Sequence, residues 1–260
     1  MNKEQILYED KDILVCYKPA GLATQTARVG QPDMVSEVAN YLSASGKALP
    51  YVGLVHRLDQ PVEGLLVFGK EQKAAGALSR QISDGRMEKY YYAIVNTGKL
   101  SGQQETASKG TLVDYLYKDA GTNTSHIVPK EKPGAKRAEL SYRIIKRMPI
   151  KEIKIKEKNY EEIEEIEKIQ ETGRVEAALV EIKLVTGRHH QIRVQMSHAG
   201  MSLFGDHKYA DEQTKKVSEI LQQKQIALCA HKLCFFHPAT GKRLAFQKEP
   251  EGYIFQNFFE

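Results

Sequence analysis

The stretch VHRLDQPVEGLLVFGK, residues 55–70, joins a charged tetrapeptide to an apolar run. The run starts at Gly64 and continues through leucine, valine and phenylalanine, which predicts a buried strand. The tetrapeptide His-Arg-Leu-Asp delivers an arginine and Asp59 to the start of that strand. A carboxylate in this place either caps local backbone or presents a charged pair to a ligand. Taken alone, an Asp before Gln-Pro favours the local structural role.

Strand patterns dominate the chain on both sides of this stretch. Helical spacing appears over residues 34–42, over residues 71–85 with Gly85 as a C-terminal stop, and after the turn Thr186-Gly187 up to Gly200. Because strands and helices do not alternate regularly, the sequence predicts an α+β fold with a mixed or largely antiparallel sheet. Further strands are predicted at residues 12–18, 87–95, 111–117, 138–146, 177–185 and 227–236.

The composition is that of a soluble globular protein. The chain has 260 residues with 41% hydrophobic content and no apolar run near the ~20 residues that a membrane span needs. The N-terminus shows no signal peptide, so a cytoplasmic location is expected. Its net charge of +5 raises the expectation of a nucleic-acid partner only slightly. The cysteines, which lack metal or redox spacing, are interpreted as small buried residues: Cys16, Cys229 and Cys234.

Residues 149–174 form a highly charged excursion between two predicted strands. Isoleucines recur at Ile150 and Ile153 and again at Ile163, Ile166 and Ile169, which is a narrow helical stripe, although the first part fits a strand equally well. The second half is acidic and would repel phosphate, so with an RNA partner this arm is expected to point away from it or to meet a protein. A solvated surface arm without a partner is the plainer interpretation.

A second candidate region is LVTGRHHQIRVQMSHAGMSLFGDHKYA, residues 184–210. The predicted helix places Arg193 beside a buried stripe, where its stem can pack while its guanidinium contacts a carboxylate. The adjacent pair His189-His190 lacks metal-ligand spacing, and no metal site is expected.

A third is the strand EKYYYAIV, residues 88–95. Alternation along a strand puts Tyr90 and Tyr92 on one face and Tyr91 on the other, together with Lys89. A tyrosine beside a lysine offers a ring on which an RNA base can stack.

Together these blocks resemble the RluA-type RNA pseudouridine synthases. YEDKDILVCYKPAGLATQ, HRLDQPVEGLLVFGK, MEKYYYAIV, the block of residues 184–210 and LCAHKLCFFHPATGKRLAFQ occur in the family's order and cover nearly the whole chain apart from the excursion. The resemblance implies a pseudouridine synthase fold, with flanking helices on a mixed, largely antiparallel sheet and a central cleft. One catalytic domain over residues 1–260, without an S4-type module ahead of it, is expected, and a monomer is the default.

The resemblance also assigns roles to residues. Asp59 falls on the family's catalytic carboxylate, Tyr91 on the tyrosine that lies against the target uracil, and Arg193 on the arginine that pairs with the carboxylate. Arg57 falls on the arginine associated with everting the nucleotide. Substrate-binding roles are expected for His56, Arg57, Lys89, Arg188, His190 and Gln191.

The implied reaction fits these residue types. Uridine becomes pseudouridine when the bond from ribose to N1 breaks and the uracil is rejoined through C5, with no change in oxidation state, so no cofactor is expected. The carboxylate must stay ionised beside the sugar, and a paired arginine lowers its pKa by ~1 to 3 units. The expected partner is structured ribosomal or transfer RNA.

This chain departs from the family pattern at several positions. The block usually continues with two variable residues and Thr-Ser-Gly, whereas here it reads Gln60-Pro61-Val62-Glu63-Gly64; His189 replaces a usual Thr and Gln195 a usual His. These changes favour a subgroup with its own RNA target. Two alternatives remain: a catalytically silent RNA-binding or chaperone protein of the same fold, and a hydrolase that uses Asp59 on free nucleosides.

Overall fold

The computed structural model describes the chain apart from residues 2, 27, 29, 45, 47–48, 99–107, 155–163, 165, 170–174 and 260. The chain divides into two compact units. The first unit comprises residues 1–90 and 229–250, and the second comprises residues 91–228 and 251–260. Strands β5 (Glu88–Asn96) and β10 (Leu228–Phe236) lie where the chain passes from one unit to the other. The single catalytic domain expected over residues 1–260 stays a prediction.

The first unit is built on strands that run in the order β1, β2, β4 and β10. Their bounds are Ile6–Glu9 for β1, Ile13–Lys18 for β2 and Glu63–Gly69 for β4. The short strand β3 (Gly53–Leu54) pairs with β4, and β11 (Arg243–Gln247) pairs with β10. β4 and β10 are parallel, while β2 and β4 are antiparallel. Both β2 and β4 are buried along their whole length, which confirms the buried strand predicted after the His-Arg-Leu-Asp block.

Two helices and a short 3-10 turn complete the first unit. Helix α1 (Met34–Ala44) buries Met34, Val38 and Leu42, and helix α2 (Gln72–Ser83) packs against β3 and β4. Gly85 follows α2 in the left-handed region at φ +71°, as expected of the predicted stop signal. The 3-10 turn η1 covers Lys3–Gln5.

Gly64 fixes the start of β4, immediately after the Asp59 loop. Its φ is +130°, a conformation that side-chain-bearing residues rarely adopt. A Cβ atom here would lie 2.5 Å from the backbone N and O atoms of Ala230 on β10. The strand can approach β10 this closely only with glycine at this position.

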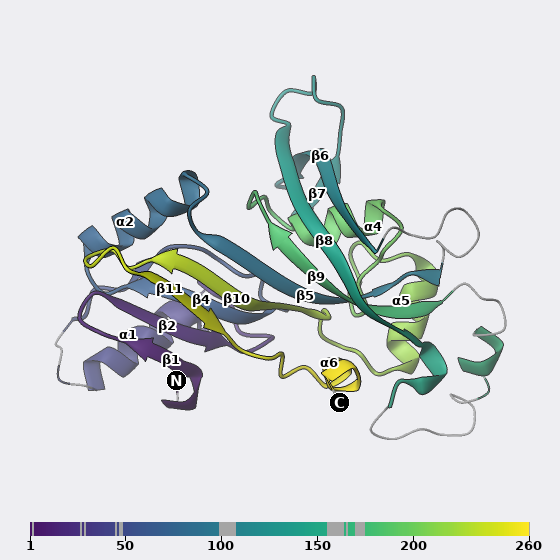
Figure 1. Ribbon diagram of the computed structural model, residues 1–260, viewed down its shortest axis with the longest axis horizontal. Coiled ribbons are helices and arrows are strands. Elements are labelled where there is room, and N and C mark those ends of the chain that lie inside the picture. Colours follow the sequence, from purple (N-terminus) through teal and green to yellow (C-terminus); the bar gives the residue numbers. More distant parts are fainter. Residues whose placement is uncertain are drawn as a thin grey trace. The chain divides into compact units, whose positions relative to one another are not determined.

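The strands of the second unit run in the order β5, β9, β8, β6 and β7. β6 (Lys109–Asp119) and β8 (Lys136–Pro149) form a long antiparallel ribbon (Figure 1), with β7 (Thr124–Ile127) on β6 and β9 (Glu176–Leu184) on β8. Helix α4 (Gln191–His198) contacts β6 and β7, where Val194 packs with Leu116 and Ala138. This unit also contains helices α5 (Glu212–Ile220) and α6 (Tyr253–Phe259).

The predicted fold class is confirmed. The sheet is mixed and largely antiparallel, helices flank it, and the predicted strands and helices occur within a few residues of their expected bounds. The cysteines are free and buried, as expected. Among the described residues, no helix is both long and apolar enough to cross a membrane. The central cleft stays a prediction.

The charged excursion is anchored at its isoleucines. Ile150 lies in the 3-10 turn η3 (Ile150–Glu152) and is fully buried, and Ile153 and Ile166 are each 2% exposed. The backbone N–H of Lys154 donates to Oδ1 of Asn257 in α6. The interpretation of this segment as a purely solvated arm is therefore wrong for these residues, because their side chains pack into the core. Ile163 and most of the acidic second half lie outside the described residues.

Candidate active site

Asp59 lies in the loop between β3 and β4, in the first unit. Its side chain is partly buried, and its backbone carbonyl accepts the N–H of Val62 at 3.0 Å. This bond closes a turn around Gln60 and Pro61, as expected of an Asp before Gln-Pro. The backbone of Asp59 therefore has the predicted local role.

A buried threonine holds the residue before Asp59. Oγ1 of Thr24 donates to the carbonyl oxygen of Leu58 at 2.8 Å and accepts the Leu58 N–H at 3.1 Å. Thr24 is 3% exposed and Leu58 5% exposed. Both backbone groups of Leu58 are thus satisfied by one hydroxyl from a segment distant in sequence.

The residue after Asp59 is held just as firmly. The carbonyl of Gln60 accepts the N–H of Gly21 at 2.9 Å, and Nε2 of Gln60 donates to the Gly21 carbonyl at 3.0 Å. The same Gln60 carbonyl also accepts a bond from Nζ of Lys18 at 3.1 Å. Asp59 therefore lies between two anchored neighbours.

Lys18 is a fully buried lysine that the sequence did not single out. Its Nζ donates to the carbonyls of Pro19, Leu22 and Gln60, at 3.0, 2.6 and 3.1 Å. Burial lowers the pKa of Lys18 to about 8, against the raising influence of the Asp59 and Glu63 carboxylates. The three N–H groups of the ammonium match the three carbonyls. In the sequence, the only indication of this role is that Lys18 is a charged residue at the end of an apolar strand.

His56 braces the strand that follows the loop. Its Nε2 accepts the N–H of Val67 in β4 at 3.3 Å, which puts the proton of the neutral ring on Nδ1. Burial and the positive charge of Lys89 lower the pKa of His56 to about 3, so the ring is neutral at pH 7. Burial also lowers the pKa of Lys89. Their substrate-binding roles stay predictions, and His56 has a structural bond as well.

Arg57 lies on the surface, where it is able to contact RNA. It is exposed, and its Nη2 donates to Oε1 of Gln25 at 2.9 Å. An exposed, partly oriented guanidinium suits contact with phosphate or a base edge.

Val62 and Glu63, where this chain departs from the usual family pattern, are core residues. Val62 is 2% exposed and Glu63 is 5% exposed. The phenol of Tyr17 donates to Oε2 of Glu63 at 2.6 Å. The positions where the family usually has hydroxyls thus hold a core valine and a buried carboxylate bonded to a tyrosine.

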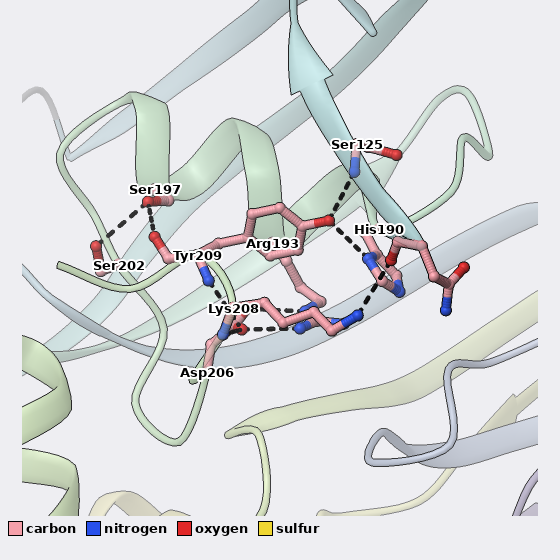
Figure 2. Close-up of polar contacts among 9 residues, drawn as sticks. Ser125, His190, Arg193, Ser197, Ser202, Asp206, Lys208 and Tyr209 are labelled. Carbon is pink, nitrogen blue, oxygen red and sulfur yellow. Dashed lines mark hydrogen bonds and ion pairs between the residues drawn. The ribbon is translucent and has the colours of Figure 1, made fainter. Parts of the chain in front are cut away.

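Arg193, in the second unit, is bound edge-on by Asp206 (Figure 2). Nε donates to Oδ2 and Nη2 donates to Oδ1, both at 2.8 Å, and the two side chains are 5% and 1% exposed. The arginine also lies 5.0 Å from the ring centroid of Tyr209. The expected position at the edge of a buried stripe is wrong, because α4 is buried on all sides from Gln191 to Met196.

Tyr209 connects this ion pair to the β7 strand (Figure 2). Its hydroxyl accepts the N–H of Ser125 at 2.8 Å and lies 2.7 Å from Nδ1 of His190. Asp206 Oδ1 in turn accepts the backbone N–H of Tyr209 at 3.3 Å. The sequence alone assigns no role to Asp206 or Tyr209, although both stand in the block of residues 184–210.

His189 and His190 stack, with ring centroids 3.7 Å apart. Oγ of Ser125 donates to the His189 carbonyl at 2.8 Å and lies 2.9 Å from Nδ1 of His189. Because that hydroxyl hydrogen is already used, Nδ1 of His189 is the donor. The pair is held by hydrogen bonds to β7 and Tyr209.

Gln191 is saturated by internal bonds. Its Oε1 accepts from the Thr186 hydroxyl and the Arg188 N–H, while Nε2 donates to the Glu139 carbonyl and to Gln195 Oε1. These four bonds use the full capacity of the amide. Its substrate-binding role stays a prediction.

Arg188 is exposed, and its Nε donates to the Arg137 carbonyl at 2.9 Å. Tyr91 is 6% exposed in β5, and its neighbour Tyr92 packs against Phe259 with ring centroids 5.3 Å apart.

The residues expected to form the site belong to both units. The first unit contains His56, Arg57, Asp59 and Lys89, and the second contains Tyr91, Arg188, His190, Gln191 and Arg193. The pairing of Asp59 with Arg193 stays a prediction.

Within the described residues, Asp10, Asp12 and His237 have ligand atoms within 4.8 Å of one another. Nδ1 of His237 accepts the N–H groups of Ala239 and Thr240, so its Nε2 donates to Asp10 Oδ2 at 2.7 Å. Burial raises the pKa of Asp10, but hydrogen bonds from backbone, His237 and Tyr8 outweigh this and lower it. The Asp10 carboxylate and both ring nitrogens of His237 are thus hydrogen-bonded within the protein.

Comparison with known proteins identifies the family. Residues 12–198 match the RNA pseudouridylate synthase family. Ribosomal large subunit pseudouridine synthase D of Zymomonas mobilis is 32% identical over 255 residues, 94% of this chain and 68% of the relative. Ribosomal large subunit pseudouridine synthase C of Vibrio cholerae is 26% identical over 251 residues, 96% of this chain and 67% of the relative.

Solved structures show the same fold. Human RNA pseudouridylate synthase domain containing 1 aligns with a TM-score of 0.67 at 17% identity, covering 95% of this chain and 83% of that one. Human RNA pseudouridylate synthase domain containing 4 aligns with a TM-score of 0.66 at 21% identity, covering 97% and 91%. The chain therefore belongs to the RNA pseudouridylate synthase family and is an RluA-type RNA pseudouridine synthase.

Proposed function

We propose that this enzyme isomerises specific uridines in structured ribosomal or transfer RNA, with Asp59 as the catalytic carboxylate. The observation that supports this most strongly is the placement of Asp59: it occupies the aspartate position of the His-Arg-Leu-Asp block, between two backbone segments that buried groups hold. The relatives are named for ribosomal large subunit RNA, which favours ribosomal RNA as the substrate. A ribosomal substrate would place the enzyme in the cytoplasm.

The proposed chemistry needs one ionised carboxylate beside the ribose. Asp59 either attacks C1′ or removes the 2′ proton, and the bond from C1′ to N1 breaks with its electron pair moving to the uracil. The uracil turns and C5 bonds to C1′. In the first route this bond replaces the ester bond between Asp59 and C1′, and in the second route C2′ recovers its proton from Asp59. N1 then gains a proton while C5 loses one, so the product has the same atoms as the substrate.

Arg193 is proposed to pair with Asp59 and to hold its carboxylate in place. Asp206 binds the edge of the guanidinium formed by Nε and Nη2, and a guanidinium can serve a second carboxylate through its other edge. The rigid Asp206 contact supports this role because it fixes the orientation of the guanidinium.

Tyr91 and Arg57 are proposed to handle the base. Removing the target uridine from its stack costs a few kcal/mol, which an arginine that contacts the opened helix can offset. An aromatic wall at Tyr91 then gives the flipped uracil a stacking surface. Lys89, Arg188 and His190 are proposed to contact RNA around this position, and His56 and Gln191 to support them.

The test is release of the C5 hydrogen by purified protein. Ribosomal and transfer RNA labelled with tritium at C5 of uridine would be incubated with wild type and with Asp59→Asn. Asp84→Asn serves as the matched control, because Asp84 is an exposed carboxylate paired with Arg86. We expect tritium release by wild type and the control and none by Asp59→Asn. RNA binding without release by wild type would instead favour a silent RNA-binding protein.

A further inference from the structure

We propose that Thr24 is a positioning residue for Asp59: with Lys18, it holds the catalytic loop so that the carboxylate meets the ribose in one geometry. This inference rests on the proposed catalytic role of Asp59. It concerns the segment of residues 18–25, to which the family resemblance assigned no role in this chain.

The Thr24 hydroxyl makes both of its hydrogen bonds to the loop that carries Asp59. Its single hydrogen goes to the Leu58 carbonyl at 2.8 Å, and its oxygen accepts the Leu58 N–H at 3.1 Å. Helix α1 begins nearby but receives its cap from Asp33, whose Oδ1 accepts the Ser36 N–H at 2.7 Å. The hydroxyl of Thr24 is therefore not a helix cap. Its hydrogen bonds hold the backbone of Leu58, the residue before Asp59.

Lys18 and Gly21 hold the other side of the carboxylate. The Gln60 carbonyl receives both the Lys18 ammonium at 3.1 Å and the Gly21 N–H at 2.9 Å. Lys18 also binds the Pro19 and Leu22 carbonyls, so one fully buried side chain fixes residues 19–22 and the loop together. Asp59 is thereby attached on both sides to the segment of residues 18–24, through the buried side chains of Lys18 and Thr24.

The attachment of the Asp59 loop to Thr24 and Lys18 should affect the catalytic rate more than the affinity for RNA. A nucleophile or base works best when its reacting atom is held close to the attack geometry, and a misplacement of about 1 Å costs about 100-fold in rate. Thr24 and Lys18 are buried, whereas the RNA must meet exposed groups such as Arg57. Loosening the buried attachments should therefore lower kcat and leave KM for RNA nearly unchanged.

The experiment compares Thr24→Val with Thr24→Ser. Valine has the shape of threonine but loses both hydrogen bonds, while serine keeps the hydroxyl. Single-turnover rates, kcat and KM on the RNA substrate, and Tm would be measured for each. We expect Thr24→Val to lower kcat by about 10- to 100-fold with KM within about twofold, and Thr24→Ser to recover most of the rate.

A Thr24→Val enzyme with lowered Tm but wild-type kcat would overturn the inference, because it would show a role in stability alone. If Thr24→Val does not fold, Gln60→Ala provides the test, since this exposed side chain donates to the Gly21 carbonyl. A lower kcat at unchanged KM supports positioning, and a raised KM or wild-type kinetics contradicts it. An active Asp59→Asn enzyme would instead refute the proposed function on which the inference rests.

Discussion

Arg193 and Asp206 form a buried, bidentate ion pair within the second unit, with both N–O distances at 2.8 Å. The arginine that the family resemblance assigns to catalysis is therefore anchored by a carboxylate of its own unit. Asp206 also accepts the backbone N–H of Lys208 at 3.0 Å, so the carboxylate is itself fixed. A guanidinium held this way has a defined orientation before any RNA binds.

Removing the Asp206 carboxylate should destabilise the protein severely. Asp206→Ala leaves the guanidinium of Arg193 buried with a lost partner, and breaking a buried pair in this way costs about 3–5 kcal/mol. Urea unfolding measures the loss. Asp84→Ala is the control, because the exposed pair of Asp84 and Arg86 should contribute less than about 1 kcal/mol. Equal effects of the two substitutions would contradict the structural assignment.

Two histidines with lowered pKa values should make the fold sensitive to acid. The pKa of His56 is lowered to about 3 and that of His231 to about 4, so in the folded protein both stay neutral where the unfolded chain takes up protons. Stability is then lost as pH falls below the unfolded value of 6.5, by about 1.4 kcal/mol per pH unit for each histidine.

His56→Gln tests this contribution, because glutamine keeps a hydrogen-bond acceptor for the Val67 N–H and does not titrate. Unfolding free energies between pH 6 and 4 should fall less steeply in the variant, by about 1.4 kcal/mol per pH unit. An unchanged slope would mean that His56 is protonated in the folded protein.

Lys18 should produce a trend of the same sign at alkaline pH. Burial lowers its pKa from 10.5 to about 8, so between these values the unfolded chain binds more protons and stability rises with pH. Lys18→Met lacks this contribution and leaves three carbonyls without their donor. The stability difference between wild type and Lys18→Met, followed by urea unfolding, should therefore grow across this range. A constant difference would contradict the lowered pKa.

Arg57 should contribute to RNA affinity through charge. Arg57→Ala should weaken binding and reduce the slope of log affinity against log salt by about 1, as expected for one lost phosphate contact. Arg80→Ala, an exposed arginine of α2, is the control and should leave the slope unchanged. Equal slopes in the two variants would remove Arg57 from the proposed RNA surface.

The long strands and helices were predictable from sequence because each repeats a clear pattern. β2 and β4 are continuous apolar runs, and Gly85 ends α2 as its position indicated. The short strands β1, β3, β7 and β11 were missed, since two to five residues cannot display a period. Helix α5 was missed although Asp211 caps it by accepting the Thr214 N–H, a signal that was present in the sequence.

The candidate site was predictable only where the sequence itself carries a motif. Asp59, Arg57 and Arg193 stand in recognisable blocks. Thr24, Lys18 and Asp206 were missed because their importance comes from contacts with residues far along the chain or across a turn. A threonine that bonds Leu58 looks, in sequence, like any other buried threonine.

The most direct measurement of the central claim is a transcriptome-wide pseudouridine map of the source cell. Wild type would be compared with a deletion strain, and with the deletion complemented by wild-type protein, Asp84→Asn or Asp59→Asn. The account predicts that a discrete ribosomal or transfer RNA site disappears on deletion and returns with wild type and Asp84→Asn but not with Asp59→Asn. Restoration of that site by Asp59→Asn would contradict Asp59 as the catalytic carboxylate.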